Sequence, residues 1–148
     1  MSLLESVIKV NEAQPGKVVA LLEKHWADLM GIRVAVLGLA FKPGTNDVRE
    51  SPAFPILREL LKRGALLKAF DPVAMDEARR VIRDAGITYC ESLSGALLDI
   101  DALIVVTAWP EFQQVPALIR GRHPAPVFVD ARRAFSRDSV ESYEGIGL

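Results

Sequence analysis

Short apolar runs alternate with amphipathic stretches from residue 31 onward, and this alternation limits the possible folds more than any other feature of the sequence. Runs 32–38 and 101–107 are nearly continuous in apolar residues, which is typical of parallel strands buried on both faces. Further strands are expected at 65–71, 87–90 and 127–131, and the tail suits one more helical or strand turn. Strands and helices that alternate through short turns predict a Rossmann-like α/β domain, a doubly wound parallel sheet of about five to six strands.

Residues that start and end helices lie between these runs. Ser51 is a good N-cap and Pro52 a good first residue for a helix over 52–63, and Gly64 suits its end. Further helices are expected over 74–85 (ended by Gly86), 92–98 (opened by Ser92) and 110–119 (opened by Pro110).

The first 30 residues lack strand signals and are expected to form an N-terminal helical arm before the domain of residues 31–148. Its large apolar side chains share one face of a 3.6-residue period, and they are Val18, Leu21, Leu22, Trp26 and Leu29. Pro15-Gly16 predicts a break between helices over 2–14 and 17–30. The arm either covers the sheet or is the end of a longer helix from a domain that this chain lacks.

Composition excludes several classes of function. The 148 residues suit one domain, and a formal net charge of −1 predicts no general attraction to nucleic acid or to a membrane. The single cysteine, Cys90, excludes an internal disulfide and suits a reducing compartment. We expect a cytoplasmic protein, because we find no signal peptide and no apolar run of about 18 residues. His25 and His123 form no metal-ligand pattern, so no metal is expected.

The turn after the first predicted strand, GLAFKPGTNDVRESP, lies where doubly wound sheets bind ligands. A dinucleotide fingerprint needs three glycines there, and only Gly38 is present, so the standard dinucleotide site is not expected. Two interpretations remain open. One is a solvated turn, and the other is a site for an anion or a sugar nucleotide that uses Phe41, Lys42 and Arg49.

The other turns at this edge carry fewer signals. Asp71 follows the second strand, and we expect it to cap the next helix rather than to hold a ribose. Arg132 and Arg133 follow the last strand, and one of them could point into the crevice while the other lies on the surface. We expect Cys90 to be a structural thiol rather than a nucleophile, because no histidine lies near it in sequence.

GLAFKPGTNDVRESP closely resembles the signature of the C-terminal domain of the UDP-glucose/GDP-mannose dehydrogenase family. FDP, TAW-EF and DAR follow in the same order and spacing, and VIKVNEAQ is similar to the end of the helix that joins the two halves of these enzymes. The resemblance implies an NAD-dependent oxidation of UDP-glucose to UDP-glucuronate by a parent protein that is a homodimer or larger. NAD would bind mainly to an N-terminal domain, and a central segment would supply the catalytic cysteine. Both are absent here, so the fragment alone should be inactive.

The resemblance also implies roles for individual residues. The UDP-sugar would be bound by Phe41 through its backbone, by Lys42 through the sugar hydroxyls, and by Arg132. Arg49 would reach the NAD of the other domain. No catalytic residue is carried over, and Cys90 lies outside the family's catalytic context. Ala108 departs from the glutamate that is usual in the family, which could loosen that wall of the site.

Three alternatives to the UDP-glucose enzyme stay open. UDP-N-acetylmannosamine and GDP-mannose dehydrogenases share most of the motif. The chain could also be a stand-alone, non-catalytic module that binds a nucleotide sugar or another protein. A response-regulator domain is disfavoured, because it needs clustered acidic residues and only Asp71 and Asp130 are suitably placed.

Overall fold

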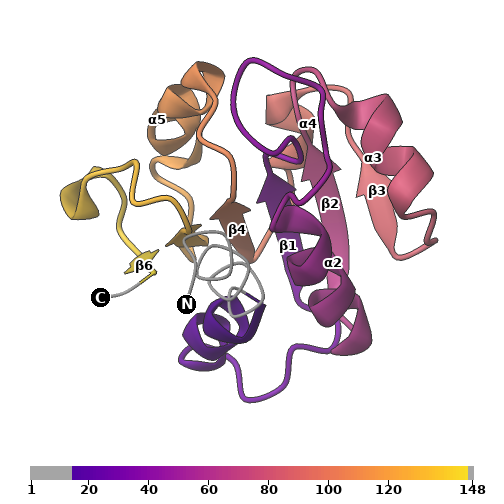
Figure 1. Cartoon of the computed structure of the whole chain (residues 1–148). Coiled ribbons are helices and arrows are strands. Elements are labelled where there is room, and N and C mark those ends of the chain that lie inside the picture. The colour runs from indigo at the N-terminus through magenta and orange to yellow at the C-terminus, as the bar shows by residue number, and fades with distance from the viewer. Residues whose placement is uncertain (1–14, 147–148) are drawn as a thin grey trace, which may run out of the picture.

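A computed structural model describes residues 15–146 and shows one six-stranded sheet, in which all neighbouring strands are parallel (Figure 1). The strand order is β3-β2-β1-β4-β5-β6, so the direction of winding reverses between β1 and β4. The strands are β1 (Arg33–Leu37), β2 (Leu66–Phe70), β3 (Ile87–Tyr89), β4 (Ala102–Val105), β5 (Val127–Asp130) and β6 (Tyr143–Gly145). The expected doubly wound, Rossmann-like sheet is confirmed.

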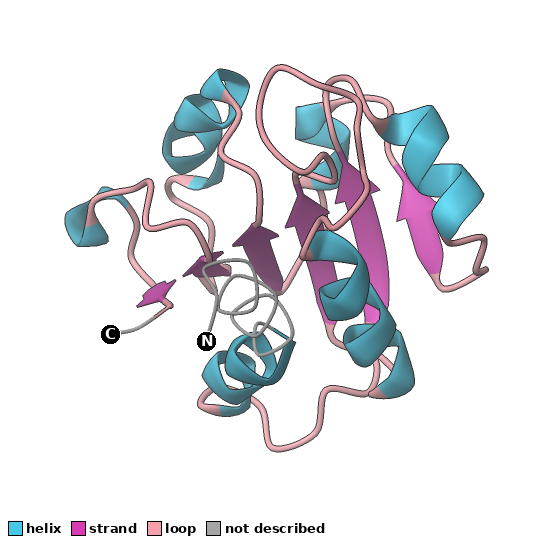
Figure 2. Cartoon of the chain, in the orientation of Figure 1, coloured by secondary structure: helices cyan, strands magenta, loops and turns pink. Residues whose placement is uncertain are grey.

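Helices cover both faces of the sheet (Figure 2). One face packs against a helix over residues 15–23, against α2 (Ala53–Lys62) and against α3 (Met75–Val81). The elements on the other face are α4 (Leu93–Ala96), the 3₁₀ helix η1 (Pro110–Gln114) and α5 (Val115–Ile119). A second 3₁₀ helix, η2 (Arg137–Ser139), precedes β6. None of the helices described within residues 15–146 has the length and apolar character needed to cross a bilayer.

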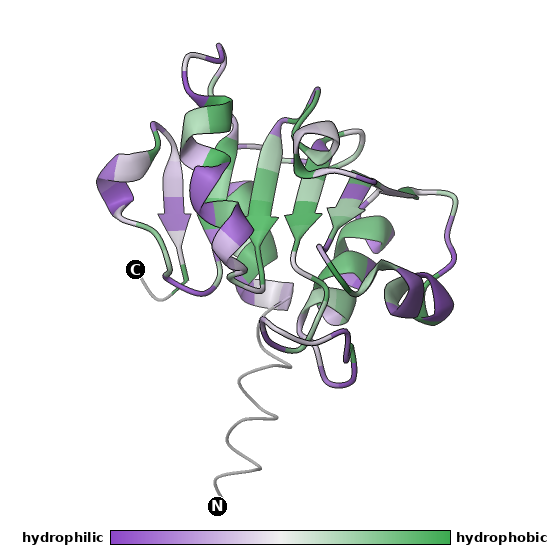
Figure 3. Cartoon of the chain, turned by 90° about the horizontal axis from the view of Figure 1, so that it is seen from above, coloured by the Kyte–Doolittle hydropathy of each residue, from purple (hydrophilic) through white to green (hydrophobic). Residues whose placement is uncertain are grey.

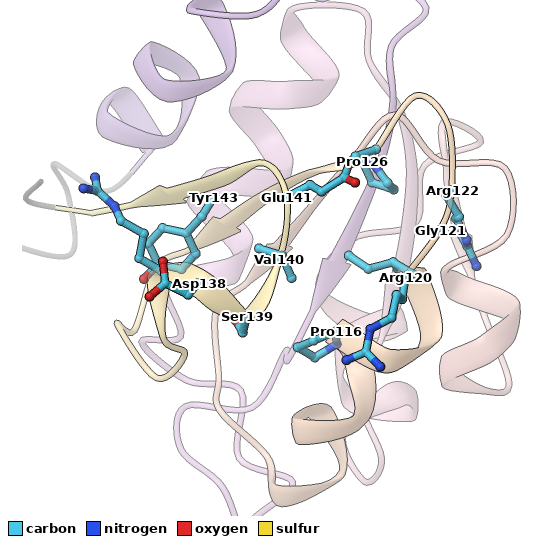
Figure 4. Close-up of a pocket in the computed structure, with 13 residues that line it drawn as sticks. Pro116, Arg120, Gly121, Arg122, Pro126, Asp138, Ser139, Val140, Glu141 and Tyr143 are labelled. Carbon is cyan, nitrogen blue, oxygen red and sulfur yellow. The ribbon is translucent and has the colours of Figure 1, made fainter.

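Two apolar cores follow from the alternation of side chains along the strands. In β1, Val34 and Val36 face the core that contains α2, while Ala35 and Leu37 face the core that contains α5. The central strands are green in Figure 3 because both of their faces are apolar. This is the pattern of a parallel sheet covered on both sides.

Several element ends differ from the sequence-based expectation. Pro52 is the N-cap of α2 rather than its first helical residue, and the Ser51 hydroxyl accepts a hydrogen bond from Ala53 N. Helix α3 ends at Val81 instead of residue 85, because the Asp84 carboxylate bonds Gly86 N in a turn that competes with the helix.

The second helix expected in the N-terminal arm ends earlier than expected. The helix includes Pro15 and ends at residue 23, whereas a helix over 17–30 was expected. It buries Val18 and Leu22 in the core, and Leu29 is buried after a turn instead of on the helix. The expected helix over 2–14 lies outside the described residues.

Gly38 ends β1 in a conformation that only glycine adopts easily, with φ at +93°. A Cβ atom there would lie 2.5 Å from Thr107 N. We predict that Gly38→Ala lowers the free energy of unfolding by about 2–5 kcal/mol, because backbone strain adds to the overlap. Gly44→Ala is the matched control, since φ is +88° but nothing lies within 4 Å, and it should lower that free energy by about 1–2 kcal/mol. Urea denaturation measures both, and equal losses would contradict the overlap.

Candidate nucleotide-sugar site

The candidate site is at the carboxyl edge of the sheet, where the loop over residues 38–52 joins β1 to α2 (Figure 1). Phe41, Lys42 and Arg49 all lie on this loop and are exposed. Arg132, also exposed, follows β5, which is separated from β1 only by β4. The fold therefore gathers the four predicted residues at one edge, although they come from two separate turns.

The buried carboxylate of Asp71, which follows β2, anchors the start of this loop. Its Oδ2 accepts hydrogen bonds from Leu39 N at 2.8 Å, Ala40 N at 2.9 Å and Trp109 Nε1 at 3.0 Å. Its Oδ1 accepts from the backbone N–H groups of Val73 and Ala74. One carboxylate thereby joins the turns that follow three neighbouring strands.

The prediction that Asp71 would cap α3 was incomplete. Asp71 bonds two N–H groups just before that helix, but the N-cap residue is Ala74. Its bonds to Leu39 and to Trp109 were missed, because they join residues far apart in sequence. The one available signal is that each of these residues follows a predicted buried strand.

Thr107 holds the same loop from the end of β4. Its Oγ1 donates a hydrogen bond of 2.6 Å to Ala40 O, and its backbone lies against Gly38. Phe41 and Lys42 are exposed immediately after these anchored residues. The start of the loop is thus held in the interior, while the side chains of Phe41 and Lys42 that follow it face solvent.

A second buried carboxylate, Asp130, shapes the turn that carries Arg132. It accepts hydrogen bonds from Ala134 N at 3.0 Å and Phe135 N at 2.8 Å, and a longer one of 3.3 Å from Arg132 N. The Tyr143 hydroxyl donates to the same carboxylate at 2.8 Å. This turn is therefore fixed by the same means as the first loop.

Arg49 forms an ion pair with Asp47 within the loop. Nε and Nη2 of the guanidinium lie 3.1 and 2.9 Å from the two carboxylate oxygens. These hydrogen bonds lower the pKa of Asp47 to about 2 and raise the pKa of Arg49. Asp47 was not among the residues predicted for the site.

The chemistry of these groups suits binding. An ammonium, two guanidinium groups and a phenyl ring suit anions, hydroxyls and apolar ring faces. Burial raises the pKa of the Cys90 thiol, which is the opposite of what a nucleophile needs. Within residues 15–146, no three His, Cys, Asp or Glu side chains gather where they could hold a metal ion.

A parallel doubly wound sheet with cationic side chains at its carboxyl edge defines an α/β domain of the nucleotide-binding class. Residues 35–137 match the profile of the UDP-glucose/GDP-mannose dehydrogenase family, UDP binding domain. The chain belongs to this family.

Relatives span most of this chain. UDP-glucose 6-dehydrogenase of Rickettsia bellii is 36% identical over 95% of the chain, and the AglM UDP-glucose 6-dehydrogenase of Haloferax volcanii is 39% identical over 97%. In both cases the chain spans 33% of the relative's length.

A solved UDP-glucose dehydrogenase from Pyrobaculum islandicum has a TM-score of 0.80 and 42% identity, with 96% of this chain and 31% of that chain covered. A UDP-D-ManNAc dehydrogenase from Pyrococcus horikoshii has a TM-score of 0.69 at 25% identity, with 94% of this chain and 32% of that chain covered.

Asp71→Asn should destabilise the protein by about 2–5 kcal/mol, because the amide nitrogen of asparagine would face N–H donors and leave them unsatisfied. Trp109→Phe removes only one of the five bonds and should cost about 1–2 kcal/mol. Urea denaturation gives both values, and hydrogen exchange at Leu39 N and Ala40 N should quicken in Asp71→Asn. If Asp71→Asn costs no more than Trp109→Phe, Asp71 does not anchor the loop.

The raised pKa of Tyr143 predicts a loss of stability at alkaline pH. Burial, and then the hydrogen bond to Asp130, raise its pKa from 10.0 to about 12. The protonated phenol is therefore favoured by the fold, so its contribution is complete below pH 10 and is lost as pH rises through 12. Tyr143→Phe should cost about 1–2 kcal/mol at neutral pH, and its difference from the wild type should shrink between these values. Urea denaturation across that range tests this, and a constant difference would contradict it.

Proposed function

We propose that this chain is the C-terminal, UDP-sugar-binding part of an NAD-dependent UDP-glucose 6-dehydrogenase, whose parent protein oxidises UDP-glucose to UDP-glucuronate. The observation that carries the proposal is the loop over residues 38–52. Its first residues are anchored by buried Asp71 and Thr107, whereas Phe41 and Lys42 are left exposed for a ligand. The likeness to UDP-glucose 6-dehydrogenases supports the choice of substrate.

In the proposed complex, the chain grips the sugar nucleotide from one side. The backbone of Phe41 and the ammonium of Lys42 bind the UDP-sugar from the loop after β1, and Arg132 binds it from the turn after β5. Lysine is suited to hydroxyls and phosphates as a point charge, and arginine to bidentate contacts with phosphate. Holding a substrate in a fixed geometry is itself a large part of catalysis.

Among the described residues, this loop lacks the features of the standard NAD site. Gly38 is the one glycine of the dinucleotide fingerprint, and both oxygens of Asp71 already accept hydrogen bonds and are not free for ribose hydroxyls. In the parent enzyme NAD would accept hydride while held mainly by another domain, and Arg49 would add one contact. We therefore expect no turnover from this chain alone. The parent enzyme would be a homodimer or larger.

Calorimetric titration of this chain with UDP-glucose tests the proposal. We predict measurable binding that weakens about tenfold in Lys42→Ala and in Arg132→Ala, because each variant loses a charge-assisted hydrogen bond. Arg133→Asn is the matched control for Arg132, since it removes the neighbouring charge and asparagine tolerates the φ of +54° found there.

Each other outcome of the titration has a definite meaning. Tighter binding of UDP-N-acetylmannosamine or GDP-mannose would change the assigned substrate. If the wild type and Lys42→Ala bound UDP-glucose equally tightly, the loop would not be part of the binding site. Failure of the chain to bind any of these nucleotides would contradict the proposal that this domain by itself grips the sugar nucleotide.

A further inference from the structure

Asp47 bonds to both halves of the loop over residues 38–52. Its backbone carbonyl accepts a hydrogen bond of 2.7 Å from Phe41 N. Its carboxylate accepts three bonds from Arg49, which come from the backbone N at 2.9 Å, Nε at 3.1 Å and Nη2 at 2.9 Å. Asp47 thus joins the residue next to Lys42 to the residue expected to reach the cofactor.

Stability does not explain this pair. The side chain of Arg49 is 87% exposed, and an exposed ion pair adds little to the free energy of unfolding. Its main effect is on orientation. A free arginine side chain has many rotamers, and ordering it upon binding weakens affinity, so a side chain that is already ordered binds more tightly.

The geometry of the pair leaves one edge of the guanidinium available. Asp47 occupies the edge formed by Nε and Nη2. The opposite edge, formed by Nη1 and the second N–H of Nη2, is a planar pair of donors that matches two oxygens of a phosphate. Among the described residues, this guanidinium is hydrogen-bonded to Asp47 alone.

We infer that Asp47 is a positioning residue, which orients Arg49 so that its Nη1–Nη2 edge binds the diphosphate of a nucleotide. This rests on the proposed function, in which Arg49 contacts NAD. Because the Asp47 carbonyl also holds Phe41, the same residue sets the position of the phosphate contact relative to the sugar-binding end of the loop.

The test follows the side-chain ¹⁵N signals of Arg49 by NMR while this chain is titrated with NAD and, separately, with inorganic pyrophosphate. Both ligands should shift the Nη signals of the wild type. Asp47→Asn should weaken the apparent affinity about two- to tenfold, because the side chain must then be ordered on binding. Asp47→Glu, which keeps a carboxylate, should weaken the affinity less than Asp47→Asn does. Asp76→Asn is the control, since it removes another exposed carboxylate, the partner of Arg79, and should change neither titration.

The outcomes separate this inference from the proposed function. If Asp47→Asn binds NAD as tightly as the wild type, or more tightly, Asp47 merely neutralises Arg49 and the inference is wrong. If UDP-glucose binds through Lys42 but Arg49 responds to neither NAD nor pyrophosphate, the inference falls and the proposed function stands. If the Arg49 signals respond to NAD or pyrophosphate and Asp47→Asn weakens that response, but UDP-glucose does not bind, the inferred phosphate contact is supported and the proposed sugar site is wrong.

Discussion

The carboxylate of Asp71 is the interaction on which the site depends. Five donors converge on it in the interior, and they come from the turns after β1, β2 and β4. A buried carboxylate is costly unless its oxygens are satisfied by hydrogen bonds, so these turns are held together by the cost of leaving it unpaired. The loop that carries Phe41 and Lys42 therefore starts from a rigid point.

The same arrangement recurs after β5, where buried Asp130 holds the turn of Arg132. In both places an interior carboxylate binds backbone N–H groups and thereby sets the path of a chain whose cationic side chains stay exposed. Asp47 does the same at the surface for the side chain of Arg49. Anionic groups of the protein thus position the cationic groups that would meet an anionic ligand, which is a form of preorganisation.

Most of the fold could be predicted because its signals are local. Nearly continuous apolar runs predicted the strands, and Ser92 and Gly64 marked helix ends as expected. The errors were at boundaries that depend on competing local bonds. The Asp84 carboxylate bonds the chain in a turn and ends α3 early, and the helix that begins by residue 15 stops at residue 23 although the apolar period continues to Leu29.

By itself the sequence determined the fold class, the family and the exposed residues proposed to bind a ligand. Strand patterning and a long signature are both made of residues that are neighbours along the chain. Only the tertiary structure decided what holds those residues in place. The bonds from Leu39 N and Trp109 Nε1 to Asp71 span 32 and 38 residues. No local pattern encodes such a contact. It exists because parallel strands bring their carboxyl ends to one edge, where a single buried charge must find all of its donors.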